Sequence, residues 1–283
     1  MENTAITSAT PEISTVPKPD LKTPISYYGW KQSMLKSILP LIPEHKIYIE
    51  PYFWGGALYW AKAPVACEII NDVNMNVVVF YEVLKNNYEA LHQKVEQTLH
   101  SRETYRKALF IYDSPRLFAD NPVVRAWAFY VVTNQGFACR IGSRGYDKVK
   151  KSAHTFQNKI DSFKEEMSTR LRFTQIEQNP AHQVILSRDS EEAFIYADPP
   201  YVNTNQGHYG GYSEEHFKRD LEVLAHVKGK FLLSNYPWPI LLDFIKKHKW
   251  YVRTIDRPLT AWNRNRTGKG RRKTELLVAN YPI

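Results

Sequence analysis

Alternation of apolar and polar residues predicts β-strands in two separated parts of the chain. In the first part, residues 46–50 (KIYIE) alternate, and a short apolar run at 66–70 predicts a second strand. Strand patterns return towards the C-terminus at 193–197, 230–234, 250–255 and 275–279, with helical patterns at 214–226 and 239–248 between them. Strands that alternate with helices predict an α/β fold with a largely parallel sheet.

The middle of the chain has the periodicity of helices. Apolar residues recur at helical spacing in five stretches, 77–85, 88–99, 102–111, 122–133 and 155–172, and the one clear strand signal among them is near 174–176. A short amphipathic helix is also predicted at 32–41, where Pro40 and Pro43 end it. We therefore predict a helical insertion over residues 86–181 within an α/β domain made of residues 24–85 and 182–283.

The N-terminal segment and the cysteines restrict the class of protein. Residues 1–23 are rich in Thr, Ser and Pro and lack a basic segment followed by an apolar one, so they predict a disordered tail and no secretory signal. No apolar run approaches the roughly 20 residues that span a bilayer. Cys67 and Cys139 are far apart and have no histidine pairs at metal-ligand spacing, so we expect neither a metal site nor a disulfide. A soluble protein of the reducing cytoplasm is the prediction.

The net charge of +9 favours a polyanionic partner. Two stretches concentrate the basic residues, and both contain interleaved aromatic residues such as Tyr146 and Trp262. Two solvated loops are the simpler interpretation, but the aromatic residues favour a surface that contacts phosphates and bases. The predicted DNA contacts from these stretches are Arg140, Arg144, Arg264, Arg266, Lys269 and Arg271.

A glycine-containing turn follows the first predicted strand. The sequence Glu50-Pro51-Tyr52-Phe53-Trp54-Gly55-Gly56 leads from that strand into a helical stretch at 57–62. A strand, a glycine-containing turn and a helix are the opening of an α/β nucleotide-binding unit. Asp72 ends the second strand about twenty residues after this turn, where such folds place the acid that binds a ribose.

The string Asp198-Pro199-Pro200-Tyr201 directly follows the apolar strand at 193–197. A pair of prolines beside an acid is often a plain turn, but the carboxyl end of a buried strand is where open α/β sheets bind ligands. The exocyclic amine of a nucleobase is a poor nucleophile because its lone pair is delocalised. If Asp198 and the carbonyl of Pro199 each accept one N–H, the lone pair can point at an electrophilic methyl group. The prolines stiffen the loop, and Tyr201 offers a flat face for a flipped base.

Four ordered motifs together resemble the Dam-like (D12 class) DNA adenine-N6 methyltransferases. They are Tyr27-Tyr28-Gly29-Trp30-Lys31, the turn from Glu50 to Gly56, Asn71-Asp72, and Asp198 to Tyr201, and the resemblance extends from about residue 24 to the C-terminus. It implies a Rossmann-like methyltransferase sheet that binds S-adenosylmethionine, an inserted helical target-recognition domain, and double-stranded DNA as the partner. The domain formed by residues 24–85 and 182–283 is then the catalytic one.

The resemblance also implies roles for individual residues. Tyr27 and Lys31 match positions that hold the methionine end of the cofactor, and a lysine is a suitable partner for a carboxylate. Asp72 matches the ribose-binding acid, and Glu50, Pro51, Tyr52 and Asp198 belong to the other cofactor motifs. The catalytic loop is Asp198, Pro199, Pro200 and Tyr201. Residues 203–212 are expected to form a mobile lid in which His208 is a lid or substrate contact.

Two tryptophans depart from the family pattern. Trp30 and Trp54 stand where the family generally has glycine, in the two loops that wrap the cofactor. Glycine allows a positive φ and a close backbone approach, whereas tryptophan brings a large ring and disfavours that conformation. Three outcomes stay open: adenine methylation with the indoles stacked beside the adenosine, a DNA-binding pseudo-enzyme, or an altered cofactor pocket.

Methyltransferases with other substrates are disfavoured by two features. An RNA or protein amino-methyltransferase of this fold would more often have Asn in place of Asp198 and would lack the helical insertion. A basic scaffold protein would not require the Asp-Pro-Pro-Tyr string. The sequence therefore favours DNA adenine as the target.

Overall fold

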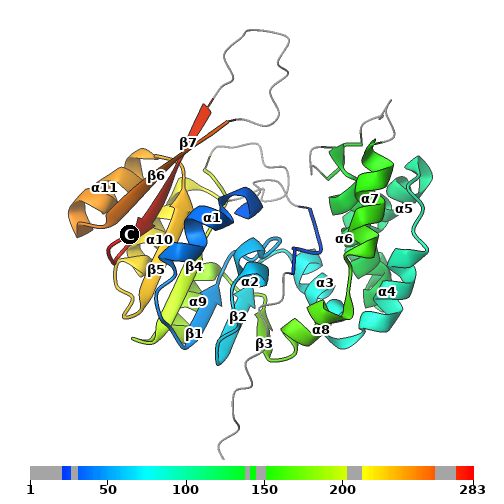
Figure 1. The fold of residues 1–283 in the computed structure, drawn as a ribbon, viewed down its shortest axis with the longest axis horizontal. Coiled ribbons are helices and arrows are strands. Elements are labelled where there is room, and N and C mark those ends of the chain that lie inside the picture. The colour runs from blue at the N-terminus through cyan, green and yellow to red at the C-terminus, as the bar shows by residue number, and fades with distance from the viewer. Residues whose placement is uncertain (1–20, 27–30, 138–140, 145–150, 203–211, 259–271) are drawn as a thin grey trace, which may run out of the picture.

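A seven-stranded sheet forms the centre of the molecule, in a computed structural model that describes residues 21–26, 31–137, 141–144, 151–202, 212–258 and 272–283 (Figure 1). The strand order is β3-β2-β1-β4-β5-β7-β6. The strands are β1 (Ile47–Glu50), β2 (Cys67–Asn71), β3 (Thr174–Glu177), β4 (Ala193–Ala197), β5 (Lys230–Asn235), β6 (Tyr251–Pro258) and β7 (Arg272–Ala279). Of the predicted disordered tail at 1–23, residues 1–20 lie outside the described residues.

The sheet is parallel from β3 to β5, and β7 is antiparallel to both of its neighbours. Ile49 in β1 pairs with Ile195 in β4, and Leu233 in β5 pairs with Val278 in β7. The predicted α/β, Rossmann-like sheet is thus confirmed. The chain order reverses between β1 and β4, and an open α/β sheet has its binding crevice at the carboxyl ends of the strands at such a switch point.

Apolar residues of β1, β4, β5 and β7 alternate between two helical layers. Tyr48, Phe194 and Leu277 belong to the core under one face of the sheet, whereas Ile49, Ile195 and Val278 belong to the core under the other. The first face carries η1 (Lys31–Met34), α1 (Leu35–Ile38), η2 (Leu39–Leu41), α2 (Ala57–Ala61) and α3 (Met75–Asn86). The second carries α9 (Ala181–Arg188), α10 (Glu214–Leu224) and α11 (Pro239–His248).

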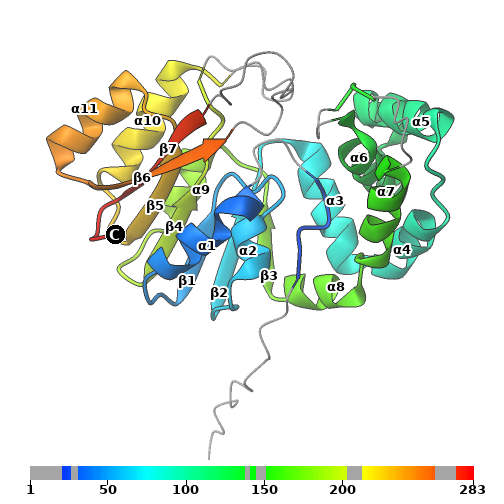
Figure 2. The same cartoon turned by 45° about the horizontal axis from the view of Figure 1, so that its top comes forward.

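Five further helices lie beside the sheet, at its β3 end (Figures 1 and 2). They are α4 (Tyr88–Glu96), α5 (Arg102–Asp113), α6 (Pro122–Gln135), α7 (Lys151–Asp161) and α8 (Glu165–Leu171), with the 3₁₀ turn η3 (Pro115–Phe118) between α5 and α6. All of them fall in the chain between β2 and β3, and α3 links them to the sheet because it contacts both α6 and β3. The division of the chain into a catalytic domain and a recognition insertion stays a prediction.

Three helical elements differ from the sequence-based expectation. The helix expected at 155–172 is two helices, because the chain turns at residues 162–164 to bury Phe163, whose ring stacks on Tyr88 with 5.8 Å between centroids. The helix expected at 32–41 is α-helical only at Leu35–Ile38 and 3₁₀ on both sides. Helix α9 has a weak apolar periodicity and was not predicted.

No helix in the described part of the chain is both long enough and apolar enough to cross a membrane. Among the same residues, no three His, Cys, Asp or Glu side chains are grouped so that they could hold a metal ion. Cys67 is a free thiol, and Cys139 lies outside the described residues.

Gly56 begins α2 in a left-handed conformation, with φ of 59°, and a methyl group on it would lie 2.3 Å from the ring of Phe53. Gly142 provides a matched control, since its φ is 80° but a methyl group there would meet nothing within 4 Å. We expect Gly142→Ala to lower the free energy of unfolding by about 1 kcal/mol through backbone strain. Gly56→Ala should cost about 1–3 kcal/mol more, because Phe53 must move. Urea unfolding of both variants tests this, and equal losses would contradict it.

Candidate active site

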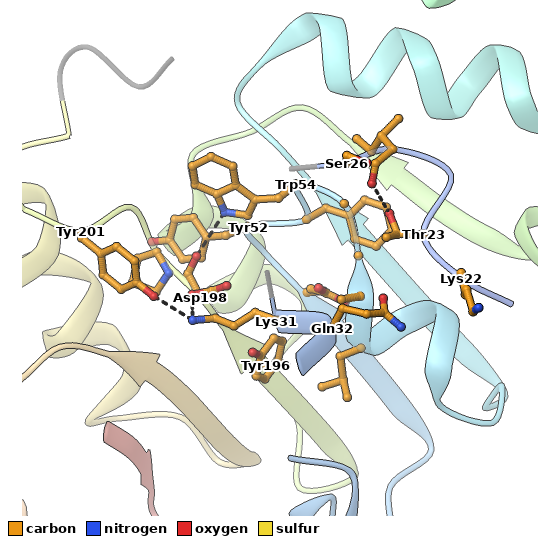
Figure 3. Close-up of a pocket in the computed structure, with 18 of the residues that line it drawn as sticks. Lys22, Thr23, Ser26, Lys31, Gln32, Tyr52, Trp54, Tyr196, Asp198 and Tyr201 are labelled. Carbon is orange, nitrogen blue, oxygen red and sulfur yellow. Dashed lines mark hydrogen bonds and ion pairs between the residues drawn. The ribbon is translucent and has the colours of Figure 1, made fainter. Parts of the chain in front are cut away.

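The carboxyl ends of β1 and β4 meet at a cavity that contains most of the predicted catalytic and cofactor residues (Figure 3). Glu50 is the last residue of β1, and Asp198 follows the last residue of β4. The cavity wall includes Lys31, Glu50, Trp54, Tyr196, Asp198 and Tyr201. Strand pairing of β1 with β4 brings these two loops together, as the sequence predicted.

The ammonium group of Lys31 lies between two carboxylates. Its Nζ is 3.1 Å from Oδ1 of Asp198, pairs closely with Oε1 of Glu275, and donates a hydrogen bond of 2.8 Å to the hydroxyl of Tyr201. The Lys31 side chain is 7% exposed and that of Glu275 is 4% exposed. Burial opposes the charge on Lys31, but Asp198 and then Glu275 outweigh it and raise the pKa of Lys31 above its ordinary value.

Tyr201 is fixed on both its hydroxyl and its ring. The hydroxyl donates to Oε1 of Glu275 at 3.0 Å, and the ring stacks on Tyr236 with centroids 4.0 Å apart and an interplanar angle of 25°. One face of the tyrosine ring is therefore covered by another aromatic ring. The predicted stacking of a flipped base on Tyr201 would have to use the face of the ring that Tyr236 does not cover.

Glu50 is a buried carboxyl group beside this charged cluster. It is 3% exposed and accepts a hydrogen bond of 2.6 Å from the hydroxyl of Tyr48. Burial raises the pKa of Glu50 to about 8, and the hydrogen bond from Tyr48 offsets only part of that rise. At neutral pH Glu50 is mainly protonated, so it can donate a hydrogen bond into the cavity.

Trp54 has a left-handed backbone conformation, which glycine adopts most readily. Its φ is 51°, its backbone N–H donates to Oδ2 of Asp72 at 3.1 Å, and its indole N–H donates to the carbonyl oxygen of Asp198 at 3.1 Å. Asp72 also accepts a hydrogen bond of 2.8 Å from the backbone N–H of Asn74. The tryptophan thus connects the predicted ribose-binding acid to the predicted catalytic loop, and Figure 3 shows its contact with Asp198.

A second cavity lies on the other side of Trp54. Asp72 lines this cavity together with Pro51, Pro200 and His182, whereas Pro199 lines the first. Tyr52 and Trp54 line both cavities, and the hydroxyl of Tyr52 donates to Asp220. The predicted cofactor residues are therefore divided between two cavities that share the wall formed by Tyr52 and Trp54.

The predicted DNA contacts are largely outside the described residues. Arg140, Arg264, Arg266, Lys269 and Arg271 lie there, as do Tyr27, Trp30 and the lid segment at 203–211. Arg144 is described: its guanidinium donates to the carbonyl oxygen of Ser101 and lies 5.7 Å from the ring centre of Tyr105. Its predicted contact with DNA stays a prediction.

Sequence reasoning missed two residues of the site. Glu275 in β7 completes the pairing of Lys31, and the hydroxyl of Tyr196 in β4 is buried in the cavity wall. Tyr196 lies two residues before Asp198, but it belongs to an apolar strand pattern. That pattern predicts a core residue and does not indicate that the Tyr196 hydroxyl belongs to the site. Glu275 stands at the edge of an apolar run, where a charged residue is usually a solvated strand end.

A Rossmann-like sheet with an Asp-Pro-Pro-Tyr loop at its switch point defines a nucleotide-binding α/β protein of the methyltransferase class. The sequence model of the D12 class N6 adenine-specific DNA methyltransferases matches residues 27–263, and the chain belongs to that family. The predicted resemblance is thereby confirmed, and the chain is classed as a DNA adenine methyltransferase.

Three relatives illustrate this membership. The type II methyltransferase M1.LlaDCHI of Lactococcus lactis subsp. cremoris is 26% identical, over 93% of this chain and 97% of its own. The DNA adenine methylase of Vibrio cholerae serotype O1 (strain ATCC 39541 / Classical Ogawa 395 / O395) is 22% identical, over 91% and 95%. The modification methylase StsI of Streptococcus sanguinis is 22% identical over 92% of this chain, but the match covers 43% of that longer protein.

The raised pKa of Glu50 predicts a pH-dependent stability. Between the unfolded pKa near 4.5 and the folded pKa of about 8, the unfolded chain has released a proton that the folded chain still holds, so folding is weakened as the pH rises. Wild type should lose up to about 1.4 kcal/mol per pH unit in this range relative to Glu50→Gln. Unfolding at pH 5 and pH 8 measures the difference, with the exposed Glu44→Gln as control. If the free energy of unfolding depended on pH in the same way in wild type and in Glu50→Gln, the raised pKa of Glu50 would be contradicted.

Proposed function

We propose that this protein transfers the methyl group of S-adenosylmethionine to N6 of an adenine flipped out of double-stranded DNA. The observation that carries the proposal is the position of Asp198, at the carboxyl end of β4, beside a cavity and oriented by the buried Lys31. Membership of the adenine-specific family supports DNA as the substrate. The relatives named as a DNA adenine methylase and a modification methylase support the same reaction.

The polar groups of the two cavities fit S-adenosylmethionine. The Tyr196 hydroxyl and the Gln32 side-chain oxygen line the first cavity and have no hydrogen-bond partner within the described structure. Glu50 adds a protonated carboxyl group there. In the second cavity, the carboxylate of Asp72, which accepts hydrogen bonds from the backbone N–H groups of Trp54 and Asn74, has the chemistry that a ribose hydroxyl requires of an acceptor. When bound, the cofactor would supply the electrophilic methyl group on a sulfonium.

The chain's own residues would position the nucleophile. Asp198 would accept one N–H of the target amine, and the carbonyl of Pro199 would accept the other. The prolines restrict the loop, and Lys31 fixes Asp198 by the ion pair at 3.1 Å. The sequence-based role of Lys31, binding the methionine end of the cofactor, stays a prediction, while its contacts favour a role in orienting Asp198.

An altered cofactor pocket is the second candidate, and Trp54 is the observation that favours it. Trp54 lines both the cavity that contains Asp198 and the cavity that contains Asp72, so its large side chain would lie near a cofactor that reaches from one to the other. In this case the protein would still bind DNA but would bind S-adenosylmethionine weakly.

Substitution of Asp198 tests the catalytic assignment. Asp198→Ala should reduce methyl transfer by at least about a hundredfold, because it removes a contact to the reacting amine, while DNA affinity stays within about twofold. The buried Lys31 keeps Glu275 as a partner, so the variant should fold. Incorporation of labelled methyl groups and a DNA-binding titration measure the two effects, with Asp243→Ala on the exposed side of α11 as control. Wild-type turnover in Asp198→Ala would refute the assignment.

Substitution of Trp54 tests the cofactor pocket. If the indole obstructs the cleft, Trp54→Gly should bind S-adenosylmethionine about tenfold or more tighter than wild type, since overpacking of this size costs about 1–3 kcal/mol. Trp54→Phe is the control, because it keeps an aromatic ring at this position and removes the indole N–H that donates to Asp198. Calorimetric titration of S-adenosylmethionine into wild type and the two variants measures the three affinities. Tight binding by wild type that weakens in Trp54→Gly would mean that the indole forms part of the binding site.

A further inference from the structure

Glu275 occupies a buried position that joins three parts of the site. One of its oxygens, Oε1, accepts hydrogen bonds from Ser234 in β5 at 2.6 Å and from the Tyr201 hydroxyl at 3.0 Å, and it also pairs with Lys31. Burial would favour the protonated acid, but Lys31, Ser234 and Tyr201 together lower the pKa of Glu275 below its ordinary value. Glu275 is therefore an anion at neutral pH.

Lys31 is shared by two carboxylates, and this sharing matters once substrate binds. An unpaired ammonium in the protein interior is strongly disfavoured. If Asp198 were the sole partner of Lys31, turning Asp198 towards a substrate N–H would leave such a charge behind. Glu275 keeps the ammonium paired, so Asp198 can turn towards the substrate amine without leaving Lys31 as an unpaired charge.

Glu275 also sets the net charge of the cluster. Lys31 contributes one positive charge, and Asp198 and Glu275 contribute one negative charge each, so the three groups carry a net charge of −1. Without Glu275 the cluster would be neutral.

The proposed reaction moves a positive charge through this site. The bond from carbon to the sulfonium sulfur breaks with its electron pair going to sulfur, and a bond from the amine nitrogen to that carbon forms. The nitrogen becomes cationic and then releases a proton to solvent. A net negative cluster stabilises both the sulfonium and the cationic amine.

We propose that Glu275 is a positioning residue that holds Lys31 in place when Asp198 binds the substrate amine, and that its charge favours the sulfonium cofactor over the neutral thioether product. The inference rests on the proposed function. It assigns a role in the reaction to a residue of β7, outside the four sequence motifs.

Glu275→Gln removes the charge and keeps the shape of the side chain. The matched control is Glu68→Gln, since Glu68 is another carboxylate with 4% exposure, paired with Lys62 and Arg170, and it does not line the cavity. Calorimetry measures the dissociation constants of S-adenosylmethionine and S-adenosylhomocysteine for each protein. We expect the preference for the sulfonium compound to fall at least fivefold in Glu275→Gln and to change less than twofold in Glu68→Gln.

The second measurement is the single-turnover methylation rate at saturating cofactor and DNA, together with the KM for DNA from steady-state rates over a range of DNA concentrations. We expect the rate to fall at least tenfold in Glu275→Gln, with the KM for DNA within twofold of wild type, and to recover in part in Glu275→Asp. An unchanged rate together with an unchanged sulfonium preference would overturn the inference. Binding of the cofactor without any methylation by wild type would instead overturn the proposed function, and the two failures are thus distinguishable.

A double variant covers the case in which Glu275→Gln does not fold. Lys31→Met combined with Glu275→Gln removes both buried partners and leaves Asp198 with its charge, so the net charge stays at −1. This protein should retain the sulfonium preference of wild type within twofold but methylate at least tenfold more slowly, since the ion pair between Lys31 and Asp198 is then lost. A wild-type rate, or a lost preference, would overturn the inference.

Discussion

The buried ammonium group of Lys31 must be paired, and this requirement connects the parts of the site to one another. Its partners come from the loop after β4 and from β7, and Ser234 of β5 lies between them in the sheet order β4-β5-β7. The register that pairs Ser234 with Leu277 keeps Glu275 near the carboxyl ends of the parallel strands. The antiparallel β7 therefore contributes a buried carboxylate to the site, besides extending the sheet.

The sequence predicted where the loops of the site lie better than it predicted which side chains contact one another. Asp198 and the turn after Glu50 could be located because a buried strand precedes each of them and parallel strands end at the same edge of a sheet. Glu275 could not be assigned, because its contact with Lys31 depends on the insertion of β7 between β5 and β6. Periodicity identifies a strand but does not give its neighbours.

The helices show a similar limit. The strong periodicity over 155–172 predicted one helix, whereas burial of Phe163 against Tyr88 requires a turn between α7 and α8. This contact joins segments that are distant in the sequence, so tertiary packing overrides the local preference. The weakly periodic α9 is held by Val184 and Ile185, which pack under the sheet, and that packing is not visible in its own sequence.

Trp54 has one of the two properties that glycine provides at a tight turn, the left-handed backbone, but lacks the other, the absence of a side chain. A family glycine supplies a left-handed backbone and an absence of side-chain volume. Trp54 keeps the left-handed backbone, with φ of 51°, at a cost of about 1–2 kcal/mol that hydrogen bonds to Asp72 and Asp198 help to offset. A weakness in cofactor binding caused by Trp54 would then come from the volume of its side chain beside the cavities that it lines, because its backbone already has a conformation that glycine favours.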